Sequence, residues 1–380
     1  MKKALIALAA AAAASCFAQG SVQMFGVIDT GISYGTASPG SSLWQVTSGE
    51  WSGSRIGFRG RESLGGGLEA GFWLEAGFDS DNGAGKSTST NNVTKSPGDG
   101  IGFNRRSTVS LIGAWGEVRL GRDKNPLYDG FNDFDPFGGD TVAAAYMWQA
   151  GREMYNNTTA VKRVSNSIGY HLPRNLGGFY GRAMVALGEQ STDVPASNLY
   201  KGDGDFAGVY VGYDNKGPFT AGVSYGKTKY SYYVPKAKGG DLTNYQIGAT
   251  YDFKVVKLWA LYSNDTVGAS VAHQELNGSG WSLGLTAPIG SGNLAASYST
   301  YKWKNGYDQK GKPYYVGTPD GDKFSVGYFY SLSKRTWLYG ALGTVSMNDG
   351  LDTPLAGSQF NPGTLSGRST GVDLGIRHSF

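Results

Sequence analysis

Hydrophobic and polar residues alternate strictly along most of the chain. In LTNYQIGATYDF, residues 242–253, one side carries Tyr245 and Ile247 and the other carries Gln246 and Thr250. The same alternation recurs in DFAGVYVGYD and GWSLGLTAPI. Because successive side chains of a strand point to opposite faces, this period of two predicts β-strands with one apolar and one polar face.

The connections between the predicted strands alternate in length. Short turns such as NKGP (215–218) and SLSKRT (331–336) interleave with longer polar segments such as residues 81–100. A soluble β-sandwich would show alternation within its strands but no consistent asymmetry in its connections. Short turns at one edge and long loops at the other are typical of outer-membrane barrels.

The pattern predicts about sixteen strands. Their expected starts lie near positions 22, 50, 67, 102, 116, 163, 178, 205, 218, 242, 256, 278, 292, 322, 336 and 367. An even number brings both chain ends to the short-turn edge, and closure removes the free sheet edges that lipid cannot satisfy. No linker or shift in composition separates a second domain. We therefore expect an all-β fold: one transmembrane antiparallel β-barrel over residues 19–380 that encloses water.

Residues 1–18, MKKALIALAAAAAASCFA, combine two lysines, an apolar run and a small residue before an expected cleavage site after Ala18. This combination predicts a secretory signal peptide. Cys16 could instead accept a lipid, but it lacks the preceding leucine that such sites usually carry. Since the chain's one cysteine lies in this segment, the mature protein is expected to have no disulfide.

Charge and composition exclude several classes of protein. Without Lys2 and Lys3 the formal net charge falls from +4 to +2, so charge indicates no nucleic-acid partner. Beyond the signal, no apolar run approaches the length of about 18 residues that a spanning helix needs. Sixty glycines and 24 tyrosines suit strands better than helices. A spanning strand needs only about 9–11 alternating residues.

Six segments, in their order along the chain, resemble the general porins of Gram-negative outer membranes, particularly the beta-proteobacterial group. They are SVQMFGVIDTGISYG at 21–35, SGSRIGFRGRESLGGGLEAGFWLEAGF at 52–78, GEVRLGRDKNPLYD at 116–129, RVSNSIGY at 163–170, YSLSKRTWLYG at 330–340 and GVDLGIRHSF at 371–380. The resemblance implies a sixteen-stranded barrel, a homotrimer, and a third external loop that folds into the lumen. It also implies that Phe380 is a recognition signal for the barrel-assembly machinery.

The expected constriction loop covers residues 124–162, the longest connection in the chain. Its aromatic residues indicate an ordered segment that packs against something, and we expect it to pack inside the barrel. FGGDT at 137–141 resembles the tip motif of the family's constriction loop. Asp133 and Asp135 precede it where many relatives place a glutamate next to the proline, so the sequence leaves open which carboxylate faces the pore.

Strand alternation predicts a set of charged side chains on the inner wall. Because Ile56 and Phe58 suit the lipid face, their neighbours point inward. The predicted inward set comprises Arg55, Arg59, Glu75, Arg106 and Arg163, together with Arg61, Arg119 and Arg182. Arg105 and Arg122 fall in the outward phase and are left out, and Asp29 and Arg377 are expected to meet across the barrel seam.

By resemblance, Arg55, Arg106 and Arg152 lie where the family's basic cluster faces the acidic loop tip. The expected pore constriction therefore comprises Arg55, Arg59, Glu75, Arg106, Asp133, Asp135, Arg152 and Arg163. Arginines facing carboxylates across a narrow gap create a transverse field that orients dipolar solutes and passes small ions. The alternative is that each arginine only ties the loop down through ion pairs. Because wall arginines outnumber the nearby acids, we expect a modest anion preference.

These observations predict an outer-membrane general diffusion porin for small hydrophilic solutes and ions, surrounded by outer-membrane lipid and lipopolysaccharide. The alternative is a substrate-specific channel for organic anions or sugars. A barrel hydrolase is disfavoured, because the chain has three histidines and no GxSxG, HExxH or P-loop sequence. We therefore expect no catalytic residues, cofactor or metal centre, although calcium at the acidic external loops stays open.

Overall fold

A computed structural model describes residues 21–37, 41–90, 92, 100–145, 162–190, 201–230, 240–268, 275–304, 320–348 and 367–380. Seventeen strand segments and one short helix make up its regular structure. They are β1 (Ser21–Ala37), β2 (Ser41–Ser48), β3 (Arg55–Gly65), β4 (Leu68–Gly77), β5 (Arg106–Gly113), β6 (Gly116–Lys124), α2 (Pro126–Asn132), β7 (Arg163–His171), β8 (Phe179–Ala186), β9 (Phe206–Asp214), β10 (Phe219–Thr228), β11 (Leu242–Asp252), β12 (Lys257–Val267), β13 (Leu276–Ile289), β14 (Gly292–Lys304), β15 (Asp320–Ser331), β16 (Thr336–Asn348) and β17 (Gly367–Ser379).

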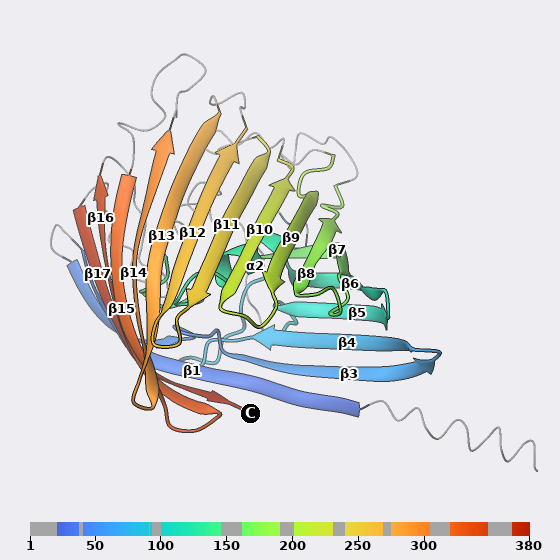
Figure 1. Ribbon diagram of the computed structural model, residues 1–380, viewed down its shortest axis with the longest axis horizontal. Coiled ribbons are helices and arrows are strands. Elements are labelled where there is room, and N and C mark those ends of the chain that lie inside the picture. The colour runs from blue at the N-terminus through green and yellow to red at the C-terminus, as the bar shows by residue number, and fades with distance from the viewer. Residues whose placement is uncertain are drawn as a thin grey trace, which may run out of the picture.

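The strands form one closed antiparallel barrel (Figure 1). Each strand pairs with its neighbours in the chain, except that β2 and β3 both pair with β1. β1 closes the ring on β17 in a register that runs from Val27↔Ser379 to Ala37↔Ser369. The backbones of Gly26 and Phe380 exchange two hydrogen bonds of 3.0 and 3.1 Å, which extend this seam to the last residue. The described part of the chain contains no helix long and apolar enough to cross a membrane.

The seventeen segments occupy sixteen positions around the wall. β3 pairs with the first part of β1 through Val27↔Arg55, and β2 pairs with the same edge of β1 further along through Thr30↔Ser48. β2 and β3 are therefore one strand that is interrupted at residues 49–54. The predicted strand start near position 50 was wrong, because Gly49 adopts φ +76° there and turns the chain out of the sheet. The predicted barrel of sixteen strands is confirmed.

The predicted alternation of short and long connections is also confirmed. The turns after β3, β5, β9, β11, β13 and β15 have two to four residues, and the turn after β7 has seven. The connections after β4, β6, β8, β10, β12, β14 and β16 are longer, from eight residues after β12 to 38 after β6. We call the two edges of the barrel the short-turn end and the long-loop end. β1 begins and β17 ends beside the short turns, so both ends of the barrel domain lie at the short-turn end.

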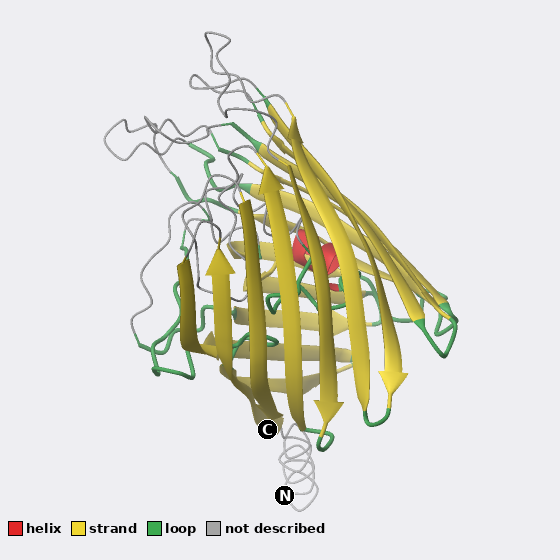
Figure 2. Ribbon diagram, turned by 90° about the vertical axis from the view of Figure 1, so that its left-hand side faces the viewer, coloured by secondary structure: helices red, strands yellow, loops and turns green. Residues whose placement is uncertain are grey.

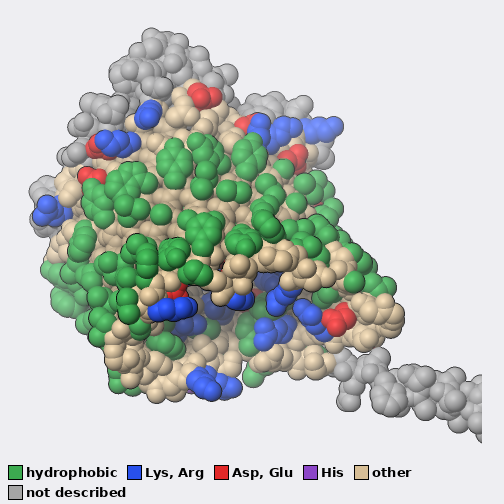
Figure 3. All heavy atoms as spheres, in the orientation of Figure 1, with side chains coloured by type: hydrophobic (Ala, Val, Ile, Leu, Met, Phe, Trp, Pro, Cys, Tyr) green, Lys and Arg blue, Asp and Glu red, His purple; other side chains and the backbone are tan. Residues whose placement is uncertain are grey.

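Hydrophobic side chains form a broad band on the outer face of the barrel seen in Figure 3, with charged side chains above and below it. Val223, Ile247 and Leu283 are each at least half exposed, whereas their inward neighbours Ser224 and Gln246 are buried. A continuous apolar band of this kind is stable only against an apolar solvent, so the pattern fits a barrel that spans a membrane.

The segment after β6 turns into the barrel. Asn125 caps α2 by accepting a hydrogen bond from the Tyr128 backbone nitrogen (2.9 Å), and Pro126 occupies the first turn. Phe131, Phe134 and Phe137 are at most 2% exposed. Figure 2 shows α2 inside the ring of strands. The hydrophobic cluster of the protein therefore lies within the barrel, between residues 125–145 and the inner wall.

Glycines on the inner wall make room for this segment. A Cβ atom at Gly222 would lie 2.9 Å from the Phe134 ring, and one at Gly248 would overlap that ring. Similar close approaches pair Pro136 with Gly284, Phe137 with Gly327 and the Val142 carbonyl with Gly343. We call the inner faces of β9–β16 the loop-bearing wall. The far end of the segment is held by the Asp373 carboxylate, which accepts a hydrogen bond from the Val142 nitrogen (2.8 Å).

Candidate functional site

A cavity of about 820 Å³ lies in the middle of the barrel, which we call the central cavity. It is bordered on one side by β3–β8 and on the other by residues 128–140 of the inward segment. Of the described residues of the loop-bearing wall, only Trp259 reaches it. We call the inner faces of β3–β8 the charged wall. In Figure 3, basic side chains gather in a hollow below the apolar surface.

Charged side chains dominate the lining of the central cavity. Eight are basic and five are acidic: Arg55, Arg105, Arg106, Arg119, Lys124, Arg163, Arg182 and Arg377 against Glu75, Asp123, Asp129, Asp135 and Asp140. The lining therefore has a formal excess of three positive charges. Such a surface concentrates anions and repels cations.

Glu75 organises the long-loop side of the charged wall. Its carboxylate lies 2.5 Å from the Arg105 Nε and 3.7 Å from the Arg55 Nε. It also accepts a hydrogen bond from the Trp73 indole nitrogen (3.0 Å). One carboxylate thus holds two guanidinium groups and one indole in place.

Asp123 on β6 likewise lies close to several guanidinium groups. Its carboxylate lies 2.5 Å from Arg119, 3.8 Å from Arg106 and 3.9 Å from Arg182. Arg182 also pairs with Asp129 on α2 and donates a hydrogen bond to the Asn125 carbonyl (2.9 Å). Arg182 therefore ties the inward segment to the wall, whereas Arg106 keeps a looser ion pair.

Asp135 stabilises the inward segment from within. Its carboxylate accepts hydrogen bonds from the backbone nitrogens of Phe137 (3.3 Å), Gly139 (2.8 Å) and Ala145 (3.4 Å). Burial raises the pKa of Asp135 to about 6, against the opposing effect of these hydrogen bonds. The side chain borders the central cavity, but it is only 2% exposed. Its negative charge therefore acts on the cavity although the backbone of the same segment encloses the carboxylate.

Asp133 lies away from the central cavity. It accepts hydrogen bonds from the hydroxyls of Tyr210 (2.8 Å) and Tyr180 (3.3 Å). It borders a second cavity of about 890 Å³ toward the short-turn end, which Arg119 and Arg182 also line. Of the two carboxylates that the sequence left open, Asp135 therefore shares a cavity with Arg55 and Arg106, and Asp133 does not.

The structure brings most of the expected constriction residues together. Five of them border the central cavity: Arg55, Glu75, Arg106, Asp135 and Arg163. Arg59 instead borders a third cavity of about 430 Å³, where it donates to the Gln23 side chain (3.0 and 2.8 Å). Arg152 lies outside the described residues. Arg59 and Asp133 thus border cavities other than the central one, and the role of the full set as the pore constriction stays a prediction.

Eight charged residues that border the central cavity were not in the expected constriction set: Arg105, Arg119, Asp123, Lys124, Asp129, Asp140, Arg182 and Arg377. Arg105 precedes the first residue of β5, so the alternation that placed it outward does not apply to it. Asp123 lies four residues after Arg119 on β6, so the alternation that placed Arg119 inward could also have identified Asp123. Arg377 lies opposite Asp29 in register at the seam. Asp29, however, accepts hydrogen bonds from Trp51 and Tyr339, and Arg377 borders the cavity.

No described group of three or more His, Cys, Asp or Glu side chains is arranged to hold a metal ion. His171 borders the second cavity beside Glu117 and Arg119. His378 is exposed on β17, and His273 lies outside the described residues.

Comparisons with known proteins agree with this architecture. A family model described as Gram-negative porin matches residues 4–350. The chain is 36% identical to the outer membrane porin protein 32 of Delftia acidovorans, and the match covers 100% of both chains.

Two solved structures are similar in fold. The anion-selective porin from Comamonas acidovorans has a TM-score of 0.76 and 31% identity, covering 95% of this chain and 100% of that one. The trimer form of OmpT from Vibrio cholerae has a TM-score of 0.63, covering 95% of this chain and 99% of that one. Its identity of 14% means that it supports the fold alone.

Proposed function

We propose a function for this chain, which belongs to the Gram-negative porins of the outer membrane. It is a general diffusion channel for small hydrophilic solutes and ions, with a modest preference for anions. The observation that carries the proposal is the lining of the central cavity, where eight basic groups face five acidic ones. Arginine suits this role because it stays charged even when several guanidinium groups are close together.

The lining residues take different parts in this proposal. Arg55, Arg105, Arg106 and Arg163 set the potential along the charged wall. Glu75 and Asp123 hold the first three in place, and Arg163 donates a hydrogen bond to the Arg105 carbonyl (2.9 Å). Arg182 ties the inward segment to the charged wall and Asp135 holds the turn of that segment, so that the central cavity stays open beside the charged wall. Field shaping and loop anchoring are thus divided among the arginines rather than being alternatives.

The channel is proposed to work without catalysis, as is general for the porin family. A homotrimer in outer-membrane lipid and lipopolysaccharide is the proposed assembly, as the resemblance to the porin family implies. Phe380, which ends the seam beside Gly26, is the proposed signal for the barrel-assembly machinery. Residues 1–18 are the proposed signal peptide. Chemical cross-linking of detergent extracts that yields monomer alone would refute the trimer.

The ion preference is tested with purified protein in a planar bilayer under a potassium chloride gradient. We expect a reversal potential of the sign that chloride permeation sets. The double substitution Arg55→Glu and Arg106→Glu leaves six basic and seven acidic groups in the lining, so selectivity should move toward cations.

A matched control is the pair Lys216→Glu and Lys254→Glu. These side chains lie in short turns and are 88% and 83% exposed. The control changes the net charge by the same amount, far from the central cavity, and should shift the reversal potential little. Equal shifts in the two double variants would show that the proposed residues do not control permeation.

A further inference from the structure

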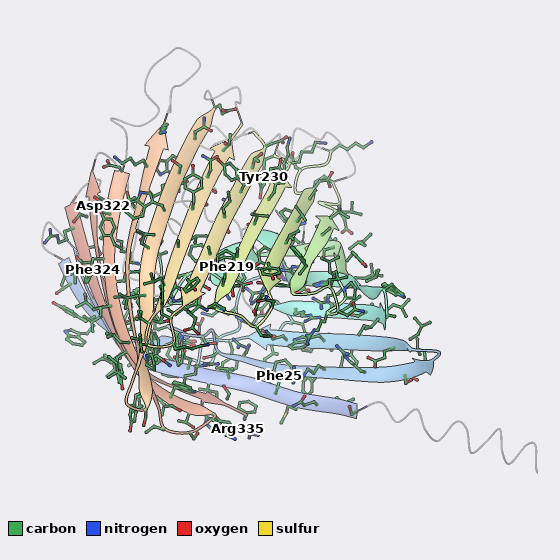
Figure 4. All side chains as sticks on the ribbon, in the orientation of Figure 1. Phe25, Phe219, Tyr230, Asp322, Phe324 and Arg335 are labelled. Carbon is green, nitrogen blue, oxygen red and sulfur yellow. The ribbon has the colours of Figure 1, made fainter. Side chains whose placement is uncertain are left out.

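Aromatic rings accompany the cations of the charged wall. The Arg106 guanidinium carbon lies 4.5 Å from the Trp73 ring centroid, and that of Arg59 lies 5.0 Å from the same ring. Trp73 is on β4, opposite Arg59 of β3 in register, whereas Arg106 comes from β5 on the other side. The indole thus stands between two guanidinium groups. Phe25, labelled in Figure 4, packs on its edge at a centroid distance of 5.0 Å.

A second pairing also lines the central cavity. The Arg377 guanidinium carbon lies 4.7 Å from the Trp51 centroid. Trp51 is fixed from behind by the Phe329 ring at 4.6 Å, and its backbone nitrogen donates to Asp29 (3.1 Å). Trp51, Trp73, Arg106 and Arg377 all line the central cavity. Two rigid ring-and-cation pairs therefore face the same water-filled space.

These guanidinium groups keep capacity for a ligand. Among the described residues, Arg106 donates one hydrogen bond, from Nε to Thr108 (3.0 Å), and its nearest carboxylate oxygen, on Asp123, is 3.8 Å away. The Nε of Arg377 is buried and has no hydrogen-bond partner within the described part of the chain. The N–H edges of an arginine bind a carboxylate in its plane, while its faces stack on rings.

An aromatic carboxylate can use both features at once. Its carboxylate takes the N–H edge of one guanidinium, and its ring contacts a guanidinium face that no indole covers. An aliphatic carboxylate of the same charge and size uses the edge alone. The central cavity of about 820 Å³ is within the range of about 300–1,000 Å³ that holds small organic ligands.

We propose that this constriction discriminates among organic anions in favour of aromatic carboxylates of the benzoate class. The inference rests on the proposed anion-conducting function and names a substrate class for it. Carbohydrates are less suited to the same rings, because the indole faces that a sugar would stack on are occupied by guanidinium groups.

The test compares two anions that differ only in the ring. Single-channel chloride current is recorded while benzoate or cyclohexanecarboxylate is added as the sodium salt. We expect benzoate to halve the current at a concentration about two- to five-fold lower, which corresponds to one additional ring contact at a solvated site. Equal half-blocking concentrations for the two anions would overturn the proposal.

Trp73→Leu removes the ring that orients the Arg106 guanidinium and changes no charge, so the ratio of the two half-blocking concentrations should fall toward one. Arg106→Lys keeps the charge and removes the planar group, and it should lower the ratio as well. The control is Trp115→Leu, at the turn between β5 and β6, where Trp115 is stacked on Tyr170 outside the lumen at 6.5 Å. That variant should keep the wild-type ratio, and a wild-type ratio in both lumen variants would refute the site.

The same recordings separate this inference from the function on which it rests. A reversal potential of the cationic sign in a chloride gradient would refute the anion-preferring channel. A reversal potential of the anionic sign, together with equal block by the two acids, would refute only the aromatic preference.

Discussion

The charged wall and the loop-bearing wall are built from different residues. β3–β8 carry arginines and the carboxylates Glu75 and Asp123, whereas the inner faces of β9–β16 carry mainly glycines and small hydroxyl side chains, with Asp265 and Lys323 as buried charges. The central cavity follows the first wall and meets the second only at Trp259 among the residues that the structure describes.

The difference teaches how one loop makes a selective pore. The inward segment needs close contact with a wall, and glycines such as Gly222 and Gly248 permit it because they have no side chain. Charged groups placed there would lose their water at a large cost in free energy. The segment therefore covers the wall that carries few charges, of which Asp265 and Lys323 are buried, and leaves the central cavity beside the wall that carries most of them.

The largest effect should come from Asp123→Asn on the charged wall. Arg106, Arg119 and Arg182 would then surround a neutral amide, and the free energy of unfolding should fall by about 3 kcal/mol. Urea unfolding of protein refolded in lipid vesicles measures this change. Asp214→Asn is the control, since its partner Lys216 is exposed at a distance of 3.0 Å and the loss should stay below about 1 kcal/mol. Equal losses would show that Asp123 is not a structural centre of that wall.

A smaller effect is expected from Gly248→Ala on the loop-bearing wall. The added methyl group would overlap the Phe134 ring, at a cost of about 1–3 kcal/mol. Displacement of the inward segment should widen the passage and increase the single-channel conductance.

The matched control for that substitution is Gly71→Ala on β4. Its Cβ atom would lie 3.4 Å from Ile112, an ordinary contact, and no part of the inward segment is near it. The conductance of this variant should equal that of the wild type. If Gly248→Ala also conducts as the wild type does, the docking of Phe134 does not limit the pore.

The smallest expected effect is a change of the anion preference with pH, which tests the contribution of the inward segment to the charge of the central cavity. Because burial raises the pKa of Asp135 from 3.8 to about 6, this carboxylate is mostly charged at pH 7 and mostly neutral at pH 5. Protonation removes a negative charge from the cavity lining, so the anion preference should increase as the pH falls. By linkage, the folded state also gains stability as the pH falls through 6 toward 4, since it binds the proton more tightly than the unfolded chain.

Reversal potentials between pH 7 and pH 5 measure the change in anion preference. Asp135→Asn should show a smaller change, with the remainder contributed by groups such as Asp129, whose pKa burial also raises. A pH response of the same size in wild type and variant would exclude Asp135 as its source.

Most of the wall was predictable from the sequence. The expected strand starts agree with the structure to within a few residues, except near position 50, where a strand was expected and the chain breaks at residues 49–54. Periodicity could not reveal the break, because a glycine occurs both in regular strands and in turns. Only the structure shows that Gly49 adopts a positive φ and that the chain leaves the sheet there. The same limit explains Arg105, which precedes the first pleated residue of β5 and turns to Glu75.

The sequence by itself determined which strand residues point inward, because the alternation of side chains is local to each strand. Only the tertiary structure decided which inward residues meet water. That outcome depends on where residues 125–145 dock, and the glycines that receive them lie on strands about a hundred residues or more further along the chain. The division between Asp133, held by Tyr180 and Tyr210, and Asp135, enclosed by its own segment, follows from the same docking.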